Sequence, residues 1–94
     1  MYFVSLSESR HHHGYVCENF DDAKNKMIKL FKNSSEFPYN FENNKSDEME
    51  ELFTDLLKCK NVNEAQRVIW EPCFDYISTR FEEIGFNKLI ELSL

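Results

Sequence analysis

The sequence predicts an α+β fold in which an N-terminal β-hairpin, with a C-terminal third strand as a further candidate, packs against three amphipathic helices. Near the N-terminus, two short β-prone runs flank a polar connection that ends in glycine, which is typical of a hairpin. Three later segments carry apolar residues at helical spacing, and each begins near residues that can cap a helix. A chain of 94 residues suits a single domain covering positions 1–94.

The hairpin prediction rests on the runs Tyr2–Leu6 and Tyr15–Cys17. The first run alternates apolar and polar residues, so its apolar side chains share one face. The polar segment Ser7–His13 and the following Gly14 connect the two runs. The tail Asn87–Leu94 also alternates, and we predict a strand there beside the first run, with a last helical turn as the alternative.

The first helix is predicted from Asn19 to about Asn33. The Asn19 side chain can accept a hydrogen bond at the helix start, and Asp21 and Asp22 suit the positive end of the helix dipole. The apolar residues cover an arc of about 160°, as expected for a helix that lies on a core. Its lysines are interpreted as a solvated face: Lys24, Lys26, Lys29 and Lys32.

The segment Asn33–Lys45 has no helical period, and Pro38 restricts its backbone. Its aromatic residues Phe37, Tyr39 and Phe41 alternate, so an extended backbone would place all three rings on one side. These rings either fix the segment to its own core or form an exposed aromatic anchor for a partner.

The second helix is predicted to begin at Asp47, which forms a capping pair with Glu50. A regular apolar stripe follows, made of Met49, Leu52, Phe53, Leu56 and Leu57. Soon afterwards Asn63 and Gln66 form another capping pair. Because so few residues separate the two helices, we expect them to pack as an antiparallel pair.

The longest sustained period runs from Asn63 to Phe86, and Pro72 interrupts it. We predict one helix that is kinked near Val68–Glu71 and ended by Gly85. The alternative is that the helix stops and a new one starts with Pro72 at its first position. At 100° per residue its apolar residues spread over about 240°. That arc is much wider than the apolar stripe of an ordinary surface helix. Such a helix must be covered from two sides, either by its own domain or by a partner.

The net charge of −6 lies entirely in the second half, because residues 1–45 carry six basic and six acidic residues and residues 46–94 carry five and eleven. Direct nucleic-acid binding is therefore not expected, since it needs clustered cations, whereas a basic partner is favoured. Phe, Tyr, Ile, Asn and Lys are abundant relative to Gly, Ala, Arg and Pro. This usage fits AT-rich coding, as in many phages, large DNA viruses and some protists.

The cysteines Cys17, Cys59 and Cys73 cannot all pair within one chain, and none lies in a C-x-x-C motif. We therefore predict reduced thiols in an intracellular, cytoplasmic protein. The apolar run at the N-terminus is too short for a signal peptide, and no stretch approaches the length of a membrane helix.

The triplet His11-His12-His13 is the most conspicuous candidate for chemistry. Neighbouring residues of a strand point to opposite faces and cannot converge on one metal ion, and Cys17 is the one nearby thiolate candidate. We therefore predict a polar turn, and no catalytic residue, metal site or cofactor. Neither a Gly-rich phosphate loop nor a nucleophile with a positioned base is evident.

These patterns predict a small, acidic, non-enzymatic protein-interaction domain, such as a phage- or virus-encoded accessory protein or inhibitor of a host protein. The partner is another protein or a copy of the chain itself in a homodimer, and no membrane is involved. An acidic nucleic-acid mimic is the alternative, and a small His/Cys metal-binding protein is a weaker one. The candidate partner-binding residues are Phe37, Tyr39, Phe41, Arg67, Trp70, Glu71 and Phe74.

Overall fold

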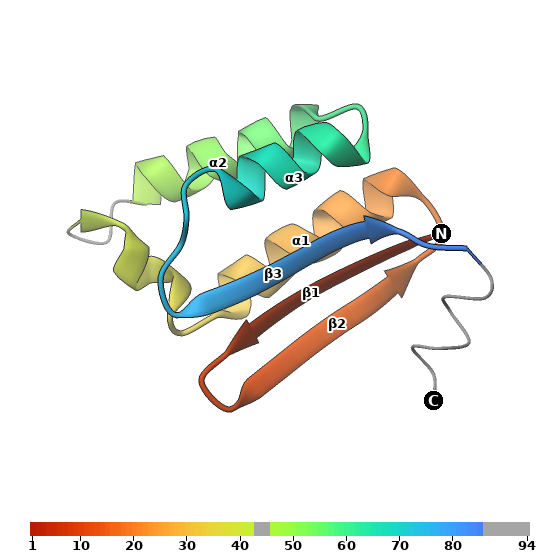
Figure 1. Cartoon of the computed structure of the whole chain (residues 1–94). Coiled ribbons are helices and arrows are strands. Elements are labelled where there is room, and N and C mark those ends of the chain that lie inside the picture. Colours follow the sequence, from red (N-terminus) through yellow and green to blue (C-terminus); the bar gives the residue numbers. More distant parts are fainter. Residues whose placement is uncertain (43–45, 86–94) are drawn as a thin grey trace.

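The structure is a computed structural model that describes residues 1–42 and 46–85. Within these residues a three-stranded antiparallel sheet carries helices on one of its faces (Figure 1). The predicted α+β fold class is confirmed. In chain order the elements are β1 (Tyr2–Glu8), β2 (His11–Cys17), α1 (Phe20–Asn33), the 3-10 helix η1 (Phe37–Asn40), α2 (Ser46–Lys58), α3 (Val62–Trp70) and β3 (Ile77–Glu83).

The sheet has the strand order β2-β1-β3, so β1 is its central strand. The N-terminal hairpin is longer than predicted, because β1 extends to Glu8 and β2 already begins at His11. Only residues 9–10 connect the two strands, in place of the polar segment Ser7–His13. Both strand partners of β1 run antiparallel to it.

The helices pack on the sheet and on one another. α1 packs on β1 and β2, α3 packs on β3, and α2 lies against both α1 and α3. Figure 1 shows α2 and α3 side by side and antiparallel, as predicted. The largest fully buried side chains between the layers are Val4, Leu6, Cys17, Met27, Phe31, Phe37, Leu56, Ile69 and Phe81.

The starts of α1 and α3 follow from asparagine caps. Asn19 Oδ1 accepts a hydrogen bond from the backbone N–H of Asp22 at 2.7 Å, and α1 covers the predicted range. At α3 the cap is Asn61, whose Oδ1 accepts from the N–H of Glu64 at 2.9 Å. This helix therefore begins slightly before the predicted start at Asn63.

The predicted single helix Asn63–Phe86 is wrong. α3 ends at Trp70, and residues 71–76 form a turn before β3 begins. In this turn Cys73 has a φ of 52° and Tyr76 a φ of 72°. A helical residue has a φ near −63°, so the helix cannot continue through these positions.

β3 takes the place of the second half of that helix. Ile77, Thr79 and Phe81 alternate toward the helical layer, and Phe81 is paired with Val4 in the register. Three- and four-residue spacings also separate Ile77, Phe81 and Ile84, which explains why the segment satisfied a helical pattern. The spacing of apolar residues alone does not reveal that this segment pairs with β1 as a third strand.

The predicted C-terminal strand exists, but β3 provides it. The prediction of a strand at Asn87–Leu94 lies outside the described residues. Gly85 does not end a helix, since it follows β3 and does not adopt a positive φ.

The buried Lys24 joins α1 to α2. Its Nζ donates to the carbonyl oxygens of Leu57 and Cys59 at 2.8 and 2.9 Å, at the C-terminal end of α2. The last carbonyls of a helix lack intrahelical donors, and a cation there is also favoured by the helix dipole. The prediction that Lys24 belongs to a solvated face is therefore wrong.

The buried Glu8 joins the end of β1 to the segment after α1. Its carboxylate accepts hydrogen bonds from the backbone N–H groups of Ser35 and Glu36, both at 3.3 Å, and from the Ser34 hydroxyl. Burial raises the pKa of Glu8 and is the largest single influence, but these hydrogen bonds together outweigh it. The pKa of Glu8 therefore lies below its ordinary value of 4.5.

Candidate functional site

The predicted partner-binding residues fall into two groups, and the first belongs to the core. The ring centroids of Phe37 and Phe41 lie 5.1 Å apart, and those of Phe37 and Phe74 lie 5.3 Å apart. Phe37 is completely buried, while Phe41 and Phe74 are partly buried. Tyr39, by contrast, is 73% exposed.

The backbone of η1 explains this division. The predicted extended segment is wrong, because residues 37–40 form a 3-10 turn with Pro38 near its start. The turn brings Phe37 and Phe41 together and leaves Tyr39 in solvent. Of the predicted aromatic anchor, only the Tyr39 ring is thus largely accessible.

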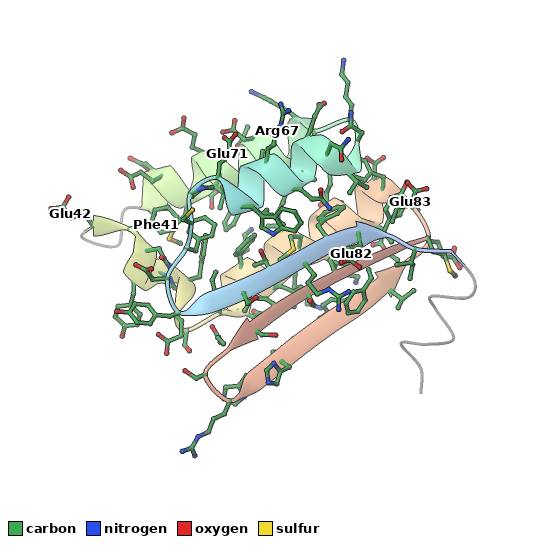
Figure 2. The ribbon with its side chains drawn as sticks, in the orientation of Figure 1. Phe41, Glu42, Arg67, Glu71, Glu82 and Glu83 are labelled. Atoms are coloured by element: carbon green, nitrogen blue, oxygen red, sulfur yellow. The ribbon has the colours of Figure 1, made fainter. Side chains whose placement is uncertain are left out.

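The second group lies at the C-terminal end of α3. Arg67, Trp70 and Glu71 are all exposed, and Figure 2 shows Arg67 and Glu71 on the outer side of the helix. The Trp70 Nε1–H donates to the carbonyl oxygen of Thr79 at 3.2 Å, and the residue stays 45% exposed. The indole is therefore fixed through its polar edge while much of the residue remains open to solvent.

A second side chain of α3 makes the same kind of contact. Gln66 Nε2 donates to the carbonyl oxygen of Phe81 at 2.7 Å. The carbonyls of Thr79 and Phe81 point away from β1, along the outer edge of β3, where a further strand would otherwise bond. Because Gln66 and Trp70 are four residues apart, they lie on the same side of α3 and together close this edge.

Trp70 lines two hollows in the surface. One lies between α3 and β3, has a volume of 310 Å³ and is lined in part by Phe74 and Ile77. The other has a volume of 450 Å³ and is lined in part by Arg67 and Glu71. Trp70 therefore borders one hollow lined by apolar and hydroxyl side chains and another lined by charged and amide side chains.

The turn at residues 71–76 extends this surface toward η1. The Asn40 side chain makes two hydrogen bonds to the backbone of Asp75 in this turn. Its Nδ2 donates to the Asp75 carbonyl at 3.0 Å, and its Oδ1 accepts from the Asp75 N–H at 2.5 Å. The residues next to this pair, Tyr39 and Tyr76, are 73% and 72% exposed. Two tyrosines thus extend the exposed aromatic surface from the turn and η1.

We call this exposed set the Trp70 surface. Sequence reasoning missed its members Cys73 and Tyr76, because it placed both in a helix. Pro72 was the one local signal that the helix ends. The Trp70 surface consists of Tyr39, Arg67, Trp70, Glu71, Cys73 and Tyr76.

The histidine triplet His11–His13 lies in β2, where a polar turn was predicted. The rings of His11 and His13 stack on one face of the strand with centroids 6.2 Å apart, whereas His12 lies on the other face. Cys17 is buried at the far end of β2, and burial raises the pKa of its thiol. No group of three or more His, Cys, Asp or Glu within residues 1–42 and 46–85 is arranged to hold a metal ion.

Comparison of the chain with protein families, with curated proteins and with solved structures finds no match. None of the helices in the described part of the chain is long and apolar enough to cross a membrane.

Proposed function

We propose that the chain is a small non-enzymatic protein-binding domain that docks onto another protein through the Trp70 surface. The observation that carries this proposal is the state of the chain's one tryptophan. Trp70 is nearly half exposed, yet its indole N–H is held by the Thr79 carbonyl. An apolar ring that is both accessible and fixed is what a binding anchor requires.

The fixed geometry lowers the cost of binding. Ordering a mobile side chain opposes association by about 0.5–1.5 kcal/mol, and the hydrogen bond to Thr79 already restricts Trp70. Trp, Tyr and Arg are also the residue types that contribute most strongly to protein interfaces, and the Trp70 surface contains all of them. Its mixture of aromatic and charged groups resembles an apolar centre with a polar rim.

The charge of the chain favours a basic partner. Exposed carboxylates gather on α2, close to α3, at Asp47, Glu50, Glu51 and Asp55. A partner that places an apolar side chain in the hollow beside Trp70 and basic groups along this acidic side would match both features. AT-rich coding supports a phage- or virus-encoded accessory protein, with inhibition of a host protein as the proposed outcome.

The cysteines support a reducing compartment such as the cytoplasm. Cys17, Cys59 and Cys73 are all free thiols in the structure, and Cys17 and Cys59 are buried. A cytoplasmic location therefore belongs to the proposal.

Replacing the indole tests the function. The protein is immobilised, partners are captured from an extract of the cell that makes it, and the affinity of each purified partner is then measured. Trp70→Ala should weaken the specific partner at least roughly 30-fold, as truncation of a binding anchor does. Leu57→Ala, at a residue of α2 that is equally exposed at 47%, should leave the affinity within about twofold of wild type.

A fold control keeps this test decisive. Trp70→Phe keeps an apolar ring but loses the indole donor, and its circular dichroism and unfolding midpoint show whether the turn survives. If a partner binds wild type, Trp70→Ala and Leu57→Ala with equal affinity, then its binding site lies elsewhere and the proposal is wrong.

Nucleic-acid mimicry is a second candidate, because the exposed acidic residues on α2 lie along one helix. A mimic should lose affinity steeply as salt rises, whereas docking through the indole should depend little on salt. Binding that collapses with salt and is insensitive to Trp70→Ala would favour the mimic.

A further inference from the structure

The two edges of the sheet differ in whether their outward carbonyl groups are occupied. On β3, side chains of α3 bond to the outward carbonyls of Thr79 and Phe81. β2 forms the opposite edge, and Figure 1 shows it at the border of the layered structure, away from α2 and α3.

The tight turn identifies the outward groups of β2. A two-residue turn closes on the pair Glu8 and His11, and the residues that flank such a turn bond to each other. Because the pattern alternates, the N–H and C=O groups of His12, Gly14 and Val16 point away from β1. None of the residues that the structure describes bonds to these groups.

The sequence of β2 also lacks the usual protection of an edge strand. Natural edges carry lysine, proline, inward charges or a bulge, or are covered by another segment. β2 contains no Lys, Arg, Asp, Glu or Pro, and its register with β1 is continuous from end to end. Most of its side chains are exposed. An open, regular and uncharged edge of this kind is a site for strand pairing.

We propose that β2 pairs antiparallel with β2 of a second copy of this chain, around a two-fold axis at Gly14, to form a six-stranded sheet. Gly14 is the midpoint of β2. In this register the outward groups of His12 bond to those of the partner's Val16, and Gly14 bonds to its own counterpart.

The pattern of β2 is complementary to itself in this register. On the face away from the helices, His12 lies beside the partner's Val16, which covers an apolar side chain that is now 45% exposed. On the helical face, His13 lies beside the partner's Tyr15. The Gly14 residues of the two copies meet on the axis, and because glycine has no side chain, no side chains clash there.

The acidic excess of the chain does not oppose this pairing. The acidic excess belongs to the second half of the chain, while residues 1–45, which contain β2 and α1, carry equal numbers of basic and acidic residues. Two copies can therefore approach through β2 without bringing their acidic sides together. A different partner protein would have to present a strand that pairs with β2, although β2 offers it no formally charged side chain to recognise.

The measurement is the mass in solution across a range of protein concentrations, by sedimentation and by light scattering, at neutral pH with a reducing agent present. Wild type should change from monomer to dimer as concentration rises. A pair of double variants tests the register: H12K/V16K puts like charges opposite each other across the axis, and H12E/V16K puts opposite charges there. Within one copy the two positions are about 13 Å apart, so both variants are comparable as monomers.

H12K/V16K should raise the dimer dissociation constant at least roughly tenfold relative to H12E/V16K, because two like-charged pairs form by symmetry. Trp70→Ala should not change the mass, which separates this inference from the proposed function. A wild-type protein that stays monomeric at high micromolar concentration would overturn the proposal. This holds both if a segment of the same chain covers the β2 edge and if nothing covers it. Equal dimerisation of both double variants would overturn it too, since the copies would then meet elsewhere.

Discussion

At the scale of single residues, the fold depends on two buried charges that tie its elements together. Lys24 provides donors to the end of α2, and Glu8 provides acceptors to the segment that follows α1. A buried charge is tolerated only where hydrogen bonds compensate its lost hydration. Each of the two side chains therefore specifies how a helix or a loop sits against its neighbour.

The pH dependence of stability tests the role of Glu8. Because its pKa is lowered in the folded state, Glu8 stabilises the fold fully at pH values above its unfolded value near 4.5, and this contribution is lost as the pH falls through the folded value. Glu8→Gln should lower the free energy of unfolding at neutral pH by about 1–3 kcal/mol. The difference from wild type should shrink in acid.

Urea unfolding of both proteins between pH 7 and pH 3 measures this difference. Glu83→Gln, at an exposed position at the end of β3, serves as the matched carboxylate control and should show little effect at neutral pH. If Glu8→Gln and Glu83→Gln have equal unfolding free energies at neutral pH, the buried carboxylate does not stabilise the fold.

These residue roles could not be predicted from the sequence. Glu8 comes after a run of alternating apolar and polar residues. In the sequence a charged residue at that point indicates the end of the strand, because nothing shows that a later loop covers its side chain. Lys24 looks like one of several lysines on α1, since its partners are carbonyls more than thirty residues away. The asparagine cap of α1 was predictable because its hydrogen bond is local.

At the scale of elements, the change from α3 to β3 decides the architecture. Helical and strand spacings overlap in this segment, so periodicity could not separate them. What ends the helix is the turn at residues 71–76, where Cys73 and Tyr76 adopt positive φ. Neither residue type favours that conformation, so the turn carried no sequence signal beyond Pro72.

Glycine at position 73 tests the turn. A residue other than glycine is disfavoured in the left-handed region by about 1–2 kcal/mol, so Cys73→Gly should be more stable than Cys73→Ala by about 1 kcal/mol. In the middle of α2 the order should reverse, with Thr54→Gly less stable than Thr54→Ala by about 1 kcal/mol. Denaturant unfolding measures all four variants. If alanine is the more stable residue at both positions, residues 71–76 are helical as the sequence pattern suggested.

At the scale of the whole molecule, the sheet separates two surfaces. The Trp70 surface lies beside β3, whereas β2, on the other side of β1, is the edge to which no described residue bonds. Pairing through β2 would place the helices of both copies on the same face and the two Trp70 surfaces at the far ends of one sheet. A dimer of this form would bind a multivalent partner with a gain from effective concentration.

The overall class was predictable because the hairpin, the first two helices and the acidic character are local or compositional properties. The candidate site was only partly predictable. Arg67, Trp70 and Glu71 lie on the surface, but Phe37 is part of the core. A binding surface was expected on one long and unusually apolar helix, whereas in the structure the exposed residues gather where the shorter α3 packs on β3. That juxtaposition depends on long-range pairing between β1 and β3.

The most direct test of this account is residue-resolved amide hydrogen exchange along β2 in a dilute sample. The account predicts alternation: the amides of His12, Gly14 and Val16 exchange rapidly, while those of His13 and Tyr15, which bond to β1, exchange slowly. Slow exchange at all five positions in dilute protein would contradict the open edge, and rapid exchange at all five would contradict the strand itself.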